Sequence, residues 1–198
     1  MLKRLSDILF SFAGVILLSP VLIVISLIVA CTSKGGVFYR QIRVGRNGHD
    51  FTLYKFRTMY TGSDRAGLLT VGGRDPRITA AGYYLRRYKL DELPQLFNVL
   101  NGSMSLVGPR PEVRKYVDLY SAEQRKVLAV KPGITDYASL AYFDENELLA
   151  ASSDPELTYI EKVLPAKLAL NQKYLNEQGF FTDLRIIAGT LKRIFKRS

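Results

Sequence analysis

The 198-residue chain contains one cysteine, Cys31, and one histidine, His49. A single cysteine excludes an intrachain disulfide, which fits a reducing compartment. With only one histidine present, neither a histidine-based metal site nor a Ser-His-Asp triad is expected. The glycines match neither a P-loop nor a dinucleotide fingerprint. Any chemistry must therefore rest on carboxylates, lysines, arginines, tyrosines and hydroxyl groups.

Acidic residues are the scarcer charged class, with 18 Asp and Glu against 28 Lys and Arg, which gives a formal net charge of +10. This balance predicts an anionic partner: nucleic acid, phosphorylated metabolites or an anionic membrane face. Charge alone does not choose among them. The length suits one domain with a real core.

Charged residues are also absent between Asp7 and Lys34. The stretch is long enough to cross a bilayer, which needs about 20 apolar residues, but Ser19-Pro20 sits near its middle. Proline in a helix interior costs roughly 3 kcal/mol unless the helix bends. Lysines and arginines flank the stretch on both sides, and positive residues prefer the cytoplasmic side. A helical hairpin that enters and leaves by one face satisfies both flanks, although a kinked spanning helix stays open.

A third interpretation of the same segment is a signal sequence. The residues from Ile28 to Cys31 resemble a bacterial lipoprotein cleavage site. In that case the rest of the chain would lie outside the cell, attached through a lipid on Cys31.

Beyond residue 34, the patterns predict a mostly helical α+β domain with a short β-hairpin. The last expected helix is amphipathic and basic, which favours packing on the core or lying in a membrane interface. The expected elements are strands at 37–45 and 51–59 joined by a turn at 45–50, a loop at 61–75, and helices at 78–88, within 90–102, and at 112–130, 159–176 and 182–196.

Asp91 and Glu92 are the first candidates for chemistry. They stand at the start of an expected helix, where the helix dipole stabilises negative charge, and Arg86 lies just upstream. A carboxylate held among cations stays ionised, which suits a nucleophile or a Mg²⁺ ligand. An ordinary acidic first helical turn is the commoner explanation of such a pair taken by itself.

Basic residues supply the other candidates. Two prolines flank Arg110 in Gly108-Pro109-Arg110-Pro111 and limit its freedom, and a guanidinium matches phosphate geometry with two prongs. Lys55 and Arg57 are two apart on a strand, so they share a face. Each basic group has a solvated surface position as its plainer explanation. Together they predict a site for a phosphorylated substrate and a metal.

These segments, in this order, resemble the bacterial sugar transferases, or monotopic phosphoglycosyl transferases. The matching pieces cover most of the chain and are LKRLSDILFSFAGVILLSPVLIVI, FYRQIRVGRNGHDFTLYKFRTM, LDELPQLFNVLNGSMSLVGPRPE, KPGIT and TDLRII. The pair LDELPQLFNVL and SLVGPRPE is the most specific part of the match.

The resemblance implies a re-entrant membrane helix hairpin over residues 1–34, broken at Ser19-Pro20. It implies a catalytic domain over residues 35–198, with amphipathic interfacial helices, on the cytoplasmic face of the bacterial inner membrane. The expected partners are a UDP-sugar, polyprenyl (undecaprenyl) phosphate and the inner leaflet of that membrane, with no nucleic acid; homodimer formation stays open.

The resemblance also implies roles for single residues. Asp91 would be the nucleophile that attacks the sugar-linked phosphate, releases UMP and holds the phosphosugar covalently until the lipid phosphate takes it. Glu92 would help hold the cofactor Mg²⁺. By position, Lys55, Arg86 and Arg110 would bind phosphates.

The match weakens after Thr135. The common family pattern continues with Gly-Leu and a later Gly-Arg-Asn, whereas this chain has Asp136-Tyr137 and no such arginine, and Asn171 stands where many members have aspartate. The sugar is therefore not predicted. A rival function is a non-enzymatic, membrane-bound module that binds anionic lipid or nucleic acid through its basic face.

Overall fold

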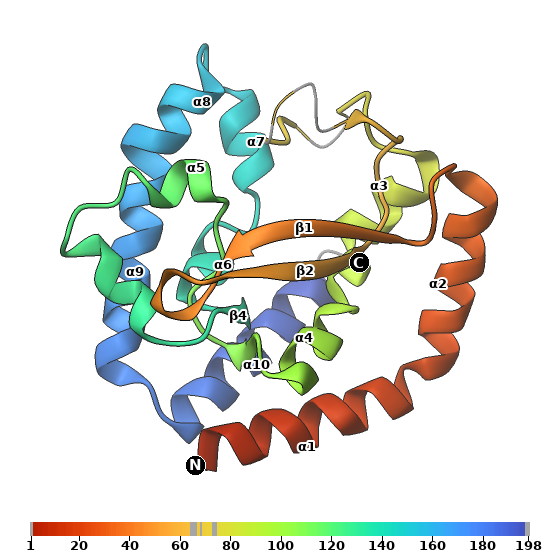
Figure 1. Ribbon diagram of the computed structural model, residues 1–198. Coiled ribbons are helices and arrows are strands. Elements are labelled where there is room, and N and C mark those ends of the chain that lie inside the picture. Colours follow the sequence, from red (N-terminus) through yellow and green to blue (C-terminus); the bar gives the residue numbers. More distant parts are fainter. Residues whose placement is uncertain (1, 64–66, 68, 73–74, 197–198) are drawn as a thin grey trace.

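The computed structural model describes residues 2–63, 67, 69–72 and 75–196 (Figure 1). The protein is mostly helical with two small sheets, which confirms the predicted α+β class. The helices are α1 (Leu2–Leu17), α2 (Ser19–Thr32), α3 (Ala80–Arg87), α4 (Gln95–Asn101), α5 (Arg114–Val117), α6 (Tyr137–Ala141), α7 (Glu145–Ala150), α8 (Pro155–Thr158), α9 (Leu164–Glu177) and α10 (Phe180–Lys196), and the strands are β1 (Phe38–Val44), β2 (Asp50–Phe56), β3 (Ser105–Val107) and β4 (Gly133–Thr135).

Strands β1 and β2 form the predicted antiparallel hairpin, which crosses the middle of Figure 1. The second strand ends at Phe56, earlier than expected. Helix α4 attaches to β2 through the buried Asn98, whose side chain accepts a hydrogen bond from the Tyr54 amide (3.0 Å) and donates one to the Thr52 carbonyl (2.7 Å). This pairing holds the segment after Asp91 and Glu92 against the strand that carries Lys55.

Strands β3 and β4 pair in parallel, although neither was expected from the sequence. Two glycines, Gly108 directly after β3 and Gly133 at the start of β4, approach each other closely. A Cβ atom on Gly133 would lie 2.1 Å from the Gly108 nitrogen, and one on Gly108 would lie 2.5 Å from the Lys131 carbonyl oxygen. A side chain at either position would therefore force the strands apart. The close approach of these two glycines fixes the backbone from which Arg110 projects.

Helices α1 and α2 form a bent pair, with a bend of 63° between them. Among the residues that the structure describes, no single helix is long and apolar enough to cross a membrane, whereas this pair passes that test together. The expected break at Ser19-Pro20 is confirmed as the position of the bend, because Pro20 lies in the first turn of α2, where a missing N–H costs little. In Figure 1, α1 runs along the base and α2 rises at one side.

The N-terminal end of α1 is fixed to the rest of the protein by polar contacts. The buried carboxylate of Asp7 accepts hydrogen bonds from the Ser105 hydroxyl (2.9 and 3.1 Å) and the Leu106 amide (3.1 Å). Lys3 pairs with Asp183 at 2.5 Å, and Arg4 donates to backbone carbonyls of α4. The sequence suggested only a membrane-flanking role for Lys3 and Arg4, so this attachment is an addition from the structure.

The expected helix at 112–130 is wrong. Only α5 and a 3₁₀ segment, Gln124–Ala129, are helical there. The Ser121 hydroxyl accepts from the Gln124 amide (3.2 Å) while the Gln124 side chain accepts from the Ser121 amide (2.8 Å). This reciprocal capping starts a new turn and interrupts the helix.

The remaining expected elements agree with the structure to within a few residues. A π-helical turn, Tyr159–Val163, precedes α9, and α10 matches the last predicted helix. Of the expected loop at 61–75, residues 64–66, 68 and 73–74 lie outside the described part.

The Asp7 contacts lead to a stability prediction. Replacing Asp7 with alanine leaves the Ser105 hydroxyl and the Leu106 N–H buried without their acceptor. We expect a loss of about 1–3 kcal/mol in the free energy of unfolding, measured by denaturant titration in detergent. The control is Ser6→Ala, because the Ser6 hydroxyl bonds only the Lys3 carbonyl of its own helix. Equal stability of both variants would show that Asp7 does not hold α1.

Candidate functional site

Asp91 and Glu92 lie in a short 3₁₀ turn, Leu90–Glu92, between α3 and α4. Lys89 enters this turn with a φ of 56°, a left-handed conformation that costs a non-glycine residue free energy and is concentrated at functional sites. The expectation that the acidic pair begins the helix is therefore wrong: α4 starts at Gln95, after Pro94. Both acidic residues are buried, Asp91 at 6% and Glu92 at 8% exposed.

Glu92 is held by two cations from different parts of the chain. Lys55 of β2 donates to its Oε1 at 2.9 Å, and Arg110 meets both carboxylate oxygens, with Nη1 at 3.3 Å from Oε2. Burial alone would raise the pKa of Glu92, but Arg110 and Lys55 outweigh it and hold that pKa well below its usual range. Glu92 is therefore a fixed negative charge.

Asp91 differs from its neighbour. Burial raises its pKa, the adjacent Glu92 adds to that effect, and the positive charges of Lys55 and Arg86 only partly offset it. The sequence analysis considered only the neighbouring cations, whereas the desolvation of a buried carboxylate is the larger effect on its pKa. Its Oδ1 is buried and has no hydrogen-bond partner among the described residues. A buried carboxylate oxygen in this state is ready to meet a ligand or a cation.

All five sequence-predicted site residues line one cavity of about 670 Å³. Arg86 also donates to the Thr70 hydroxyl at 2.7 Å. The roles of Asp91, Glu92, Lys55, Arg86 and Arg110 stay predictions, but the fold brings them together from four separate segments.

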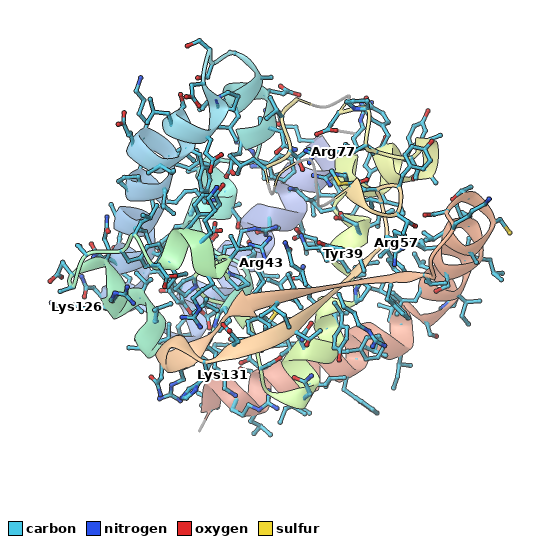
Figure 2. The ribbon with its side chains drawn as sticks, turned by 45° about the horizontal axis from the view of Figure 1, so that its top comes forward. Tyr39, Arg43, Arg57, Arg77, Lys126 and Lys131 are labelled. Atoms are coloured by element: carbon cyan, nitrogen blue, oxygen red, sulfur yellow. The ribbon has the colours of Figure 1, made fainter. Side chains whose placement is uncertain are left out.

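Arg57, expected to share the phosphate-binding face of Lys55, lies beyond the end of β2. Its guanidinium donates to the carbonyls of Gly35 and Gly36, so its main contacts hold the turn before β1. It still lines the cavity, together with Tyr39, Arg43 and Arg77. Figure 2 shows these four side chains around one central region, whereas Lys126 and Lys131 lie at the outer edge.

The cavity is lined by both polar and apolar side chains. The polar ones include the acidic pair and its cations. Many of the apolar ones come from α1 and the residue after it, from α4 and the turn before it, and from the amphipathic α10: Phe10, Leu18, Leu93, Leu96, Leu184, Ile187, Leu191 and Ile194. Such a cavity can take a ligand whose anionic head continues into a hydrocarbon chain.

A second buried charged network, which the sequence did not reveal, adjoins Arg110. Glu112 accepts a hydrogen bond from the Tyr159 hydroxyl and lies 3.5 Å from Arg43 and 3.8 Å from Lys167. Lys167 also pairs with Glu145 at 2.9 Å. The one available signal was a lone lysine in the apolar sequence LPAKLAL, whose charge needs a partner when the helix packs on the core.

The acidic pair fits a magnesium ion in part. Within the described ranges, no three histidine, cysteine or acidic residues gather at one point. Mg²⁺, however, is often held by one or two carboxylates together with substrate phosphates and water. Asp91, with its unpartnered Oδ1, and Glu92 supply such a pair. They would hold the ion only together with a phosphorylated substrate.

The chain is similar to known proteins along most of its length. A family model described as "Bacterial sugar transferase" matches residues 1–197. The chain is 39% identical over 98% of its length to a UDP-N-acetylgalactosamine-undecaprenyl-phosphate N-acetylgalactosaminephosphotransferase of Aeromonas hydrophila, covering 43% of that protein. It is 45% identical over 70% of its length to a UDP-glucose:undecaprenyl-phosphate glucose-1-phosphate transferase of Klebsiella pneumoniae, covering 30% of it. It is also 38% identical over 98% of its length to the uncharacterized sugar transferase EpsL of Bacillus subtilis, covering 87% of it.

The different environments of the two carboxylates predict opposite effects on stability in metal-free buffer at neutral pH. Asp91→Asn removes a buried charge whose pKa is raised, so we expect the melting temperature to rise. Glu92→Gln leaves Lys55 and Arg110 without their partner, and removing one member of a buried ion pair costs about 3–5 kcal/mol. Both effects are measured by thermal unfolding in detergent.

The control for that comparison is Glu156→Gln, which removes the exposed ion pair with Lys115 and should cost roughly 0–1 kcal/mol. Equal destabilisation by the Asp91 and Glu92 variants would contradict the assignment of opposite environments.

Proposed function

The chain belongs to the bacterial sugar transferase family, and we propose that it transfers a sugar 1-phosphate from a UDP-sugar to a polyprenyl phosphate and releases UMP. The observation that carries this proposal is one cavity lined both by a buried acidic pair among cations and by many apolar side chains. One substrate is a sugar nucleotide with two phosphates, and the other is a phosphate on a long hydrocarbon. The relatives from Aeromonas and Klebsiella carry both substrate classes in their names.

In the first half-reaction, a carboxylate oxygen of Asp91 attacks the sugar-linked phosphorus of the UDP-sugar. The new bond joins Asp91 to the phosphosugar, the bond to the bridging oxygen breaks, and UMP leaves with that oxygen. In the second half-reaction, an oxygen of the lipid phosphate attacks the same phosphorus and the Asp91 carboxylate is released. The product is a sugar joined to the lipid by a diphosphate. No histidine is needed, because the nucleophiles react as anions.

The cations around Asp91 then have distinct tasks. Lys55 and Arg110 hold Glu92, and both line the same cavity as Arg86, so their remaining donors would be available to phosphate oxygens there. An arginine fork suits phosphate oxygens because two N–H groups can bond at once. Mg²⁺, when bound by Asp91, Glu92 and the diphosphate, would supply positive charge where the leaving phosphate gains negative charge.

Asp91 must be deprotonated to act, although burial raises its pKa. A nearby divalent cation lowers the pKa of a carboxylate. A bound divalent cation would therefore favour the ionised form of Asp91, and the ionised carboxylate would in turn help to hold that cation.

We also propose a membrane location. The apolar faces of the bent helix pair and of α10 are exposed, with Phe12 59%, Leu27 61% and Phe195 74% exposed. If the pair is re-entrant, these faces lie in the inner leaflet, and the apolar side chains of the cavity would be available to the lipid. The catalytic part then lies on the cytoplasmic side, where UDP-sugars are made.

Family membership alone does not identify the sugar that this chain would transfer. It also does not assign to this chain the whole-protein activities of its longer relatives. The chain spans 43% of the Aeromonas protein and 30% of the Klebsiella protein. Those two relatives are named for different sugars, N-acetylgalactosamine and glucose. The residues that select the sugar are therefore expected to differ among relatives, while those that bind phosphate need not.

The covalent step has a direct test. Protein given a radiolabelled UDP-sugar and Mg²⁺, but no lipid phosphate, should release at most one UMP per site and keep the sugar label. Hydroxylamine should remove the label, because it cleaves acyl phosphates. Asp91→Asn should show neither label nor turnover, while the exposed Asp118→Asn should behave as the unaltered protein. Turnover by Asp91→Asn at a substantial fraction of the normal rate would rule out this mechanism.

The topology has a separate test in intact bacterial cells. In a Cys31→Ser background, Leu2→Cys and Lys34→Cys place thiols at the two exposed ends of the bent pair. Both should resist an impermeant thiol reagent until the cells are lysed, because a re-entrant hairpin leaves both ends in the cytoplasm. These positions avoid Lys3, whose pairing with Asp183 holds α1. Labelling of one position alone before lysis would indicate a spanning helix instead.

A further inference from the structure

The proposed mechanism leaves one charged pair of the cavity without a task. Glu145, at the start of α7, and Lys167, in α9, both line the cavity with Arg110 and Asp91. Lys167 is 6% exposed. Burying a charged pair carries a desolvation cost, so a pair kept in this position calls for a structural or functional explanation.

The geometry holds Glu145 firmly in place. Its Oε2 accepts from Lys167 at 2.9 Å. Lys167 is itself fixed, since it lies 3.8 Å from Glu112 and 5.3 Å from the centre of the Tyr159 ring. With Oε2 engaged by Lys167, Oε1 is the oxygen that remains for a bound molecule. A carboxylate oxygen accepts hydrogen bonds from hydroxyl or amide N–H groups.

The charge of Glu145 makes it unsuited to binding phosphate, because two anions repel each other. Its partner Lys167 nevertheless lies 3.8 Å from Glu112, two residues along the chain from Arg110, so Glu145 stands near the phosphates that Arg110 would bind. The group bonded directly to the phosphate that Asp91 attacks is the sugar, whereas the ribose is one phosphate further away. A fixed acceptor beside Arg110 is thus best placed for a sugar donor group.

The sequence around Glu145 supports this assignment. Asp136 and Glu145 belong to the stretch after Thr135, where the chain departs from the pattern of the family it resembles. Asp136 has a backbone task there, since it accepts from the Arg110 amide at 3.2 Å and caps α6 through Ser139. Glu145 has no such backbone role through its side chain, which leaves it available to a substrate.

We propose that Glu145, positioned by Lys167, accepts a hydrogen bond from a hydroxyl or N–H group of the sugar and so determines which UDP-sugar is used. The inference rests on the proposed function for its substrate class. It assigns a residue that discriminates between sugars, and it leaves the phosphate-binding groups unchanged.

The experiment compares the full-length protein with Glu145→Gln in detergent with Mg²⁺. Binding of UDP, UDP-glucose, UDP-galactose, UDP-N-acetylglucosamine and UDP-N-acetylgalactosamine is measured by calorimetry with Asp91→Asn added to both proteins, so that no UMP is released during the titration. UMP release is measured with Asp91 intact and undecaprenyl phosphate present. The control is Glu147→Gln, which changes an exposed carboxylate on the same helix. Glu145→Asp keeps the charge facing Lys167 but shortens the side chain by one methylene, so it replaces Glu145→Gln if that variant is unstable.

We expect the Glu145 variant to change the ratio of kcat/KM, and of affinity, between the preferred UDP-sugar and its epimer by roughly tenfold or more, as for a lost hydrogen bond to a charged group. Binding of UDP itself should stay within roughly twofold. Glu147→Gln should leave all ratios unchanged.

Three results would overturn the inference, and unchanged ratios are the first. The second is an equal loss of affinity for every ligand including UDP, which would indicate ribose binding or a structural role. The third is that the unaltered protein binds no UDP-sugar more tightly than UDP. If the Glu145 variant alters the sugar affinities but the protein never releases UMP, Glu145 is still a sugar-binding residue, and the proposed reaction is ruled out.

Discussion

The buried carboxylate of Glu92 is the interaction on which the site depends. Lys55 reaches it from β2 and Arg110 reaches it from the loop after β3, so one side chain ties together three segments distant in sequence. Burying three charges is favourable only when each meets an opposite charge in good geometry. The contacts of Asn98 fix the β2 backbone, which carries Lys55. The close approach of Gly108 and Gly133 fixes the backbone that carries Arg110. Together they supply that geometry.

Because Glu92 takes up the nearest cations, Asp91 is left in a different state. Two adjacent carboxylates thus have pKa values shifted in opposite directions, down for Glu92 and up for Asp91. Neighbouring acids whose environments separate their pKa values are a recurrent way for a protein to give them separate roles. In the proposed reaction, Glu92 organises charge while Asp91 exchanges bonds with phosphorus.

The bent helix pair is part of the site as well as its attachment to a membrane. Asp7 and Lys3 hold the start of α1 against β3 and α10, and Phe10 of α1 and Leu18, which follows it, line the cavity. A shift of α1 would therefore reshape the cavity that Asp91 also lines. This coupling gives a physical reason for an apolar segment with a charged, buried residue near its beginning.

The sequence by itself determined the features that depend on neighbouring residues. The hairpin turn, the bend at Ser19-Pro20 and the amphipathic α10 all follow from local propensity and periodicity. Motif resemblance also singled out five residues that the fold brings to one cavity. Tertiary structure alone decided the β3–β4 pairing, the network of Glu112, Lys167 and Glu145, and the raised pKa of Asp91. These depend on which groups meet after the chain has folded and on how much water they lose, and neither quantity is encoded in the spacing of residues along the chain.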